Sequence, residues 1–105
     1  MYKETKQLLK ELKENVDSVY RFEEDGNKYG LLIISRGDLL FYQENEKALV
    51  CEISARYSLI APETIKEWDN SHKITAEERP AILEKIQHFF KKAYQNDLKV
   101  FSEKG

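Results

Sequence analysis

The sequence is poor in the residues that build disulfides, metal sites and activated nucleophiles. It contains one cysteine and two histidines in 105 residues. Cys51 ends the apolar run of residues 48–51, which indicates a buried thiol whose pKa is raised rather than one activated for chemistry. His72 and His88 have no second His or Cys at ligand spacing, so a zinc site is not expected.

Glycine and long apolar runs are scarce as well. None of the four glycines stands at the spacing of a nucleotide-binding loop, and no nucleophile with a base or paired carboxylates is visible. The longest apolar runs, such as residues 31–34, are far too short to span a bilayer. The charged N-terminal residues are not followed by a signal-peptide core. We therefore expect a cytoplasmic protein without enzymatic activity, cofactor, metal or membrane association.

The chain does have enough apolar residues for one core and a heavily charged surface. Hydrophobic residues make up 41% and charged residues 34% of the sequence, which is typical of a single globular domain over residues 1–105. The net charge is only −2, but residues 23–69 contain ten acidic and five basic side chains. An acidic middle argues against nucleic acid as a ligand and suits a basic protein partner.

Apolar spacing in the first half predicts a helix followed by a strand meander. Leucines at helical spacing predict a helix over residues 3–14 that lies on the domain surface. Strands are expected over residues 16–22, 29–34, 39–42 and 48–58, separated by turns at 25–27, 35–38 and 45–47. Residues 25–27 are a strong turn signal, because Gly26 and Asn27 tolerate positive φ. In the last strand the alternation assigns one face to the core, namely Leu49, Cys51, Ile53, Ala55 and Tyr57.

The second half predicts one long helix and a final strand. Thr75 and Glu78 match a capping box that starts the helix, and Pro80 is expected to remove one hydrogen bond inside its early turns. An apolar stripe follows at spacings of three and four residues: Ile82, Leu83, Ile86, Phe89, Phe90, Ala93 and Tyr94. Asn96 is the expected stop, and residues 98–101 form a short strand.

These elements predict an α+β fold in the order α-β-β-β-β-α-β. Its sheet is a four-stranded antiparallel meander plus the short C-terminal strand. It is accompanied by the N-terminal helix and by the long amphipathic helix, which packs on one sheet face.

Aromatic residues allow two interpretations. Trp68, the only tryptophan, stands between Glu67 and Asp69, where it is either a lid over the core or a binding anchor. Tyrosines on the predicted strands pose the same choice between packing and contact, namely Tyr20, Tyr29, Tyr42 and Tyr57.

The segment around Trp68 resembles a family of bacterial immunity proteins from polymorphic toxin systems, including contact-dependent growth inhibition. The likeness consists of Ile65-Lys66-Glu67-Trp68-Asp69, the helix start Ile74-Thr75-Ala76-Glu77-Glu78-Arg79 and the spaced apolar residues of Ile82-Leu83-Glu84-Lys85-Ile86. A meander before this segment and a short strand after the helix are also similar. The resemblance implies a small cytoplasmic protein that binds a cognate toxin domain and blocks it.

We therefore expect an inhibitor that occludes the active site of a toxin, for example the basic cleft of a nuclease. The candidate partner-binding residues are Glu23, Glu24, Asp25, Glu44, Glu46, Glu67 and Asp69 as charges, with Tyr42 and Trp68 as anchors. Two other classes stay open. One is a small-ligand module with Trp68 and the tyrosines lining a pocket between helix and sheet. The other is a structural adaptor that forms a homo-oligomer, because the oligomeric state is not predicted.

Overall fold

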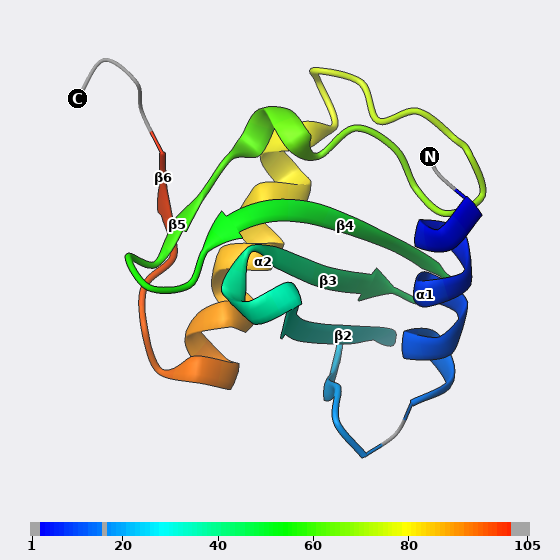
Figure 1. Ribbon diagram of the computed structural model, residues 1–105, viewed down its shortest axis with the longest axis horizontal. Coiled ribbons are helices and arrows are strands. Elements are labelled where there is room, and N and C mark those ends of the chain that lie inside the picture. The colour runs from blue at the N-terminus through cyan, green and yellow to red at the C-terminus, as the bar shows by residue number, and fades with distance from the viewer. Residues whose placement is uncertain (1–2, 16, 102–105) are drawn as a thin grey trace.

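The computed structural model describes residues 3–15 and 17–101, which form a curled sheet of six strands with two α-helices (Figure 1). The strands lie in chain order and are β1 (Tyr20–Glu24), β2 (Asn27–Ile34), β3 (Leu39–Glu44), β4 (Lys47–Ser54), β5 (Leu59–Ile60) and β6 (Lys99–Val100). Neighbours are antiparallel from β1 to β5, and β6 is parallel to β5. The α+β class is confirmed. The antiparallel run has five strands rather than the four expected, since β5 was not predicted, and the parallel β6 makes the sheet mixed.

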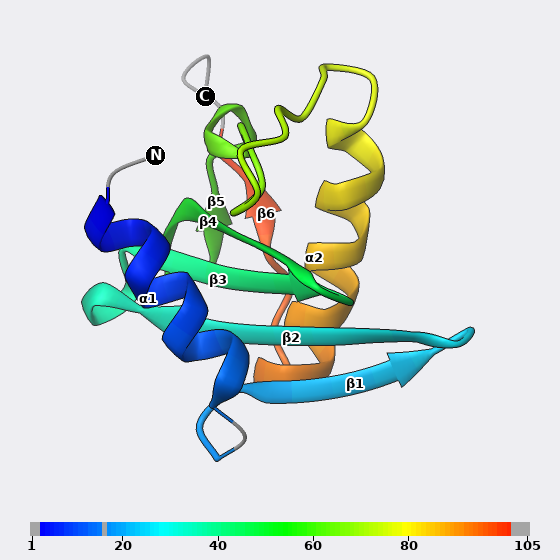
Figure 2. The same cartoon turned by 90° about the vertical axis from the view of Figure 1, so that its right-hand side faces the viewer.

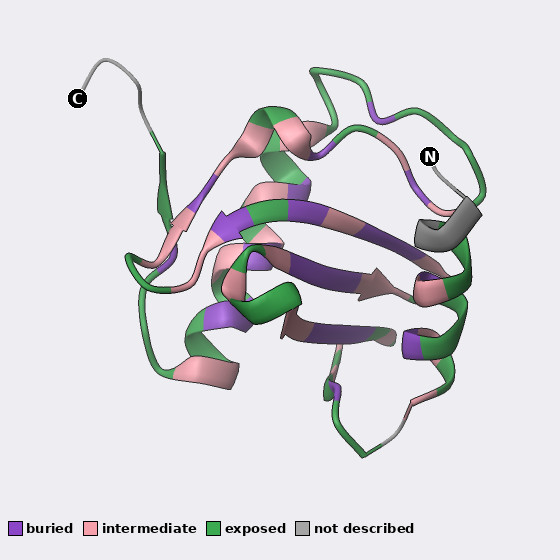
Figure 3. Ribbon diagram, in the orientation of Figure 1, coloured by how far each residue is buried: buried purple, intermediate pink, exposed green. Residues whose placement is uncertain are grey.

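The two helices cover opposite faces of the sheet. In Figure 2, α1 (Lys3–Glu14) and α2 (Arg79–Tyr94) lie on either side of the strands. Side chains alternate along a strand, so β3 sends Tyr42 into the larger cluster beneath α2 and Phe41 into a smaller cluster with Leu9 and Leu12 of α1. Figure 3 shows buried residues concentrated on the central strands. No helix among the described residues is long and apolar enough to cross a membrane.

The first hairpin is tighter than the sequence indicated. Asp25 and Gly26 form its two-residue turn, with φ of 52° and 79°, as the commonest hairpin turns require. Asn27, which was expected to lie in the turn, instead starts β2. The predicted first strand began too early, because residues 17–19 are not extended strand and Val16 lies outside the described residues.

The fourth predicted strand was too long. β4 ends at Ser54, and a turn follows in which Ser58 adopts φ of 55° and its N–H donates to the Ala55 carbonyl. Tyr57 is 65% exposed, so its assignment to the buried face was wrong. The alternation of apolar residues continues through this turn and no glycine or proline interrupts it, which hid the boundary. Two short 3-10 turns, η1 (Ser35–Gly37) and η2 (Pro62–Thr64), complete the chain path.

The start of α2 confirms the capping box and corrects the interpretation of Pro80. Thr75 N–H donates to Glu78 Oε1 at 2.9 Å, and Glu78 N–H donates to Thr75 Oγ1 at 3.1 Å. The helix itself begins at Arg79, so Pro80 occupies the first turn, where its missing N–H has no helical partner to lose. The helix ends at Tyr94, and Gln95 closes it in a left-handed conformation. All seven stripe residues are buried or packed against the core.

Candidate functional site

Trp68 is a core lid. Its side chain is 3% exposed, its ring centroid lies 6.2 Å from that of Tyr42, and the Lys47 ammonium stands 4.6 Å over the ring. Tyr42 is 0% exposed and Ile65, at the start of the same loop, is also fully buried. Neither Trp68 nor Tyr42 presents a ring at the surface, so their prediction as binding anchors is corrected to a packing role.

Asp69 fastens the Trp68 loop to β4 and α1. Its N–H donates to the Ala48 carbonyl at 2.8 Å, and its Oδ1 accepts the Ala48 N–H at 3.1 Å. Its Oδ2 accepts a hydrogen bond from Lys13 Nζ at 2.8 Å. Ala48 pairs with Gln43 of β3 on its other side, so Asp69 supplies the backbone partners that a further strand would give. The half-buried Glu67 lies in the same loop, which a bridge to Lys73 closes.

Two other candidate carboxylates are paired with α2. Glu24 accepts hydrogen bonds from Lys92 and from the His88 ring, and those bonds lower the pKa of its carboxyl group, with Lys92 as the larger cause. Glu44 Oε1 accepts the Tyr42 hydroxyl at 2.8 Å and lies 3.3 Å from Lys85 Nζ.

Two buried groups carry raised pKa values, both for structural reasons. Burial, together with the neighbouring Glu44 carboxylate, raises the pKa of Tyr42. Burial likewise raises the pKa of the Cys51 thiol to about 12, as expected from its 1% exposure. A thiol that stays protonated and shielded from solvent behaves as a small hydrophobic side chain.

Three candidate carboxylates remain exposed. Glu23 ends in solvent on β1, Asp25 lies in the turn after β1, and Glu46 lies in the turn between β3 and β4. In the described part of the chain, none of the three takes part in an ion pair or side-chain hydrogen bond. Both turns lie at the same end of the sheet, since β1 to β4 run alternately up and down. We call Glu23, Asp25 and Glu46 the acidic rim.

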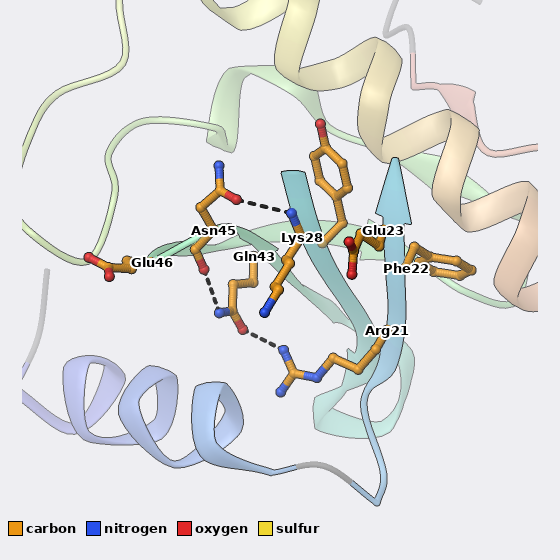
Figure 4. Close-up of a pocket in the computed structure, with 8 residues that line it drawn as sticks. Arg21, Phe22, Glu23, Lys28, Gln43, Asn45 and Glu46 are labelled. Atoms are coloured by element: carbon orange, nitrogen blue, oxygen red, sulfur yellow. Dashed lines mark hydrogen bonds between the residues drawn. The ribbon is translucent and has the colours of Figure 1, made fainter. Parts of the chain in front are cut away.

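A groove of about 670 Å³ lies beside α1 at this end of the sheet. It is lined by Arg21, Phe22, Glu23, Lys28, Tyr29, Gln43, Asn45 and Glu46. In Figure 4, Glu23 and Glu46 stand on opposite sides of the groove, with Gln43 and Lys28 between them. The groove thus has a carboxylate on either side, while Phe22 and Tyr29 also belong to its lining.

Arg21 lines the groove, but its charge is directed into the fold. Its Nη1 donates to Gln43 Oε1 at 2.6 Å, and its Nη2 donates to the carbonyls of Leu12, Lys13 and Asn15 at 3.0, 3.1 and 2.7 Å. The guanidinium therefore caps the C-terminal end of α1, where a cation is favourable. Partial burial lowers the pKa of Arg21.

Gly30 makes room for this arrangement, and the sequence reasoning did not identify either residue. Arg21 and Gly30 are register partners on β1 and β2, and a Cβ on Gly30 would lie 2.7 Å from Arg21 Nη1. An arginine opposite a glycine across a predicted hairpin is the signal that could have revealed the pair.

Comparison with protein-family models, curated proteins and solved structures finds no match to this chain. The likeness of residues 65–86 to toxin immunity proteins therefore stays a prediction from the sequence.

Proposed function

We propose that the protein is a bacterial immunity protein that acts in the cytoplasm. In this proposal it binds a cognate toxin domain, with a nuclease as the favoured class, and blocks its active site. It acts by binding and performs no catalysis of its own. The acidic rim and the groove between Glu23 and Glu46 form the contact surface. The main support for the proposal is that the three carboxylates of the acidic rim lie at one end of the sheet and form no ion pair or side-chain hydrogen bond in the described part of the chain.

Electrostatics favour a basic partner at this surface. Exposed charges of one sign steer an oppositely charged partner and speed association, and like charges across an interface weaken binding by several kcal/mol. A cleft that binds nucleic acid is lined by Lys and Arg, so an acidic surface that enters it competes with the substrate phosphates. Two basic residues, Arg21 and Lys28, also line the groove. Arg21 donates to Gln43 and to the end of α1, and neither residue forms an ion pair in the part of the chain that the structure describes.

The surface is also rigid, which favours affinity. On the α2 side, the Phe22 and Phe89 rings stack with centroids 5.0 Å apart, and Glu24 is tied to Lys92. On the α1 side, Arg21 is held by four hydrogen bonds. A preorganised surface loses little conformational entropy on binding.

The contact set is therefore smaller than the one proposed from the sequence. Glu24, Glu44 and Asp69 are engaged in the fold, and Tyr42 and Trp68 are buried. Glu67 lies in the Trp68 loop, outside the acidic rim.

Co-expression tests the proposal. The C-terminal domain encoded by the adjacent upstream gene is produced in bacteria with and without this protein. We expect the domain alone to stop growth and the pair to grow normally. Equal toxicity in both cultures, or no toxicity in either, would contradict the pairing.

Matched charge reversals then locate the surface. The variant Glu23→Lys/Asp25→Lys/Glu46→Lys is expected to bind the domain on the order of 100-fold more weakly, since three repulsive contacts replace attractive ones. The control Glu52→Lys/Glu63→Lys/Asp97→Lys changes the same charge among exposed residues near the opposite sheet edge and is expected to protect as well as wild type. Equal loss in both variants would indicate net charge rather than this surface.

A further inference from the structure

β1 leaves a row of backbone groups open at the edge of the sheet. It is the terminal strand and pairs only with β2, from Tyr20↔Leu31 to Glu24↔Asn27. The Lys28 N–H and carbonyl both bond to Asn45, on the β3 side. Because the backbone direction alternates along a strand, Glu23, the register partner of Lys28, points its N–H and carbonyl away from β2. The same alternation turns the N–H and the carbonyl of Arg21 outward, away from β2.

This edge is held firmly in place from both faces. On one face Tyr20 contacts Tyr94 edge-on, with ring centroids 5.1 Å apart, and Phe22 stacks on Phe89. On the other face Arg21 is bonded to the end of α1 and to Gln43. The register of β1 with β2 is continuous over five residues. The strand is therefore a rigid template for an added strand.

Some of the devices that usually prevent strand addition are missing from this edge. Sheet edges are commonly protected by charged side chains, above all lysine, by inward-pointing charges, by proline, by a bulge or by shortness. β1 reads Tyr-Arg-Phe-Glu-Glu, without lysine or proline, and its register with β2 shows no bulge. Its Arg21 and Glu24 charges form hydrogen bonds or ion pairs within the fold. The opposite edge strand, β6, has only two residues. Tyr20, Arg21 and Glu23 are exposed on β1, and the exposed carboxylates there are those of Glu23 and, just beyond the strand, Asp25.

We propose that β1 accepts an extended basic segment of the partner as an additional strand. A residue opposite Glu23 would point to the groove face and lie within about 5 Å of its Cβ, so Lys or Arg fits there. Alternate positions along the segment would then place a second cation near Asp25. That the segment belongs to a toxin domain rests on the proposed function.

A second copy of this chain fits the edge less well. It would bring its own Glu23 and Asp25 to the same place, and its Arg21 is already bonded within its own chain. It therefore offers no free cation from its β1.

Amide exchange with synthetic peptides tests the inference without the toxin. The probes are Lys-Val-Lys-Val-Lys-Val-Lys and, as control, Glu-Val-Glu-Val-Glu-Val-Glu, each at millimolar concentration. The amides of Arg21 and Glu23 face solvent and should exchange fast in the free protein. With the basic peptide we expect both to slow about tenfold or more, the effect of one new backbone hydrogen bond each. The acidic peptide should leave them unchanged.

Two results would overturn the inference. One is that neither amide slows with the basic peptide. The other is that both slow without peptide as the protein concentration rises, which would assign the edge to a second copy. Binding of the basic peptide in a protein that fails the co-expression test would retain the strand addition and refute only the toxin as its source.

Two substitutions separate the contribution of the backbone hydrogen bond to peptide binding from that of the charge. Glu23→Pro removes the outward N–H at an edge position where proline is tolerated, and its fold is checked by circular dichroism and melting. Glu23→Gln keeps the N–H and removes the charge. We expect binding of the basic peptide to fall about tenfold in the first variant and about twofold to fivefold in the second. Equal losses would indicate that charge alone holds the peptide.

Discussion

The Trp68 loop and the β1–β2 hairpin both carry acidic residues, yet they use them in opposite ways. In the loop, Asp69 accepts hydrogen bonds from Ala48 and Lys13 and closes the sheet against α1. At the hairpin, Glu23 and Asp25 end in solvent with no partner among the described residues. The stretch that makes the sequence resemble a family therefore holds the fold together. The exposed carboxylates of the acidic rim lie on β1 and in two turns, outside that stretch.

This difference arises from position relative to the sheet. Asp69 lies beside a stretch of β4 that has no neighbouring strand on the side away from β3, because β5 pairs only with Ile53 and Ser54. Its backbone and carboxylate bond to the Ala48 N–H and carbonyl there. Asp25 lies in the turn of the hairpin, where it lines a groove beside α2 but forms no ion pair or side-chain hydrogen bond with the described residues. Glu24 differs from both neighbours because it faces α2, where Lys92 and His88 reach it.

Of the variants considered, Trp68→Ala should destabilise the protein most. Removing a buried ring beside Tyr42 leaves a cavity, and we expect a loss of about 3–5 kcal/mol in the free energy of unfolding. Urea denaturation followed by circular dichroism measures it. Tyr57→Ala is the control, because Tyr57 is 65% exposed, and it should change stability by less than about 0.5 kcal/mol. Similar losses in the two variants would show that Trp68 is not a core residue.

Asp69→Ala should have the next largest effect. It leaves the Ala48 N–H and the Lys13 ammonium without their acceptor, and we expect a loss of about 1.5–3 kcal/mol. Asp97→Ala removes an exposed carboxylate that pairs loosely with Lys91 at 3.5 Å, and should lose less than about 0.5 kcal/mol. The same denaturation experiment compares them. An unchanged midpoint in Asp69→Ala would refute the role given to this carboxylate.

Protonation of Glu24 at low pH should break its ion pairs with Lys92 and His88 of α2. The pKa of Glu24 is lowered in the folded state, so its contribution to stability is present above the pKa of the unfolded chain, near 4.3. That contribution is lost as pH falls through the lower folded value. Melting temperatures of wild type and Glu24→Gln should differ at pH 7 and converge below about pH 4. A gap that persists at pH 2 would contradict the pairing with Lys92 and His88.

Most of the fold was predictable because apolar periodicity is local. The stripe from Ile82 to Tyr94, the capping box at Thr75 and the tight turns of the meander all follow from short-range spacing. The end of β4 and the existence of β5 were not predictable, because Ser58 adopts positive φ without a glycine to signal it. The parallel pairing of β6 with β5 joins residues about forty positions apart and leaves no local pattern.

The sequence predicted candidate residues for the site, but not which of them are paired or buried in the fold. The acidic character of the segment selected seven carboxylates, but which of them lack an ion pair depends on partners from other elements. Lys92 engages Glu24, Lys85 engages Glu44 and Lys13 engages Asp69. The groove between Glu23 and Glu46 arises from strand register. Burial of Trp68 depends on how the loop folds over β4, so its spacing in the sequence could not choose between lid and anchor.

In the proposed function, Glu23, Asp25 and Glu46 bind a partner while Asp69 stabilises the fold. Titration calorimetry of the upstream gene's domain with two variants, each also melted, tests it most directly. We predict that Glu23→Lys/Asp25→Lys/Glu46→Lys keeps the wild-type melting temperature within about 3 °C but binds on the order of 100-fold more weakly. Asp69→Ala should melt lower yet bind with wild-type affinity at temperatures where it is folded. Wild-type binding by the triple variant, with lost binding by folded Asp69→Ala, would contradict the account.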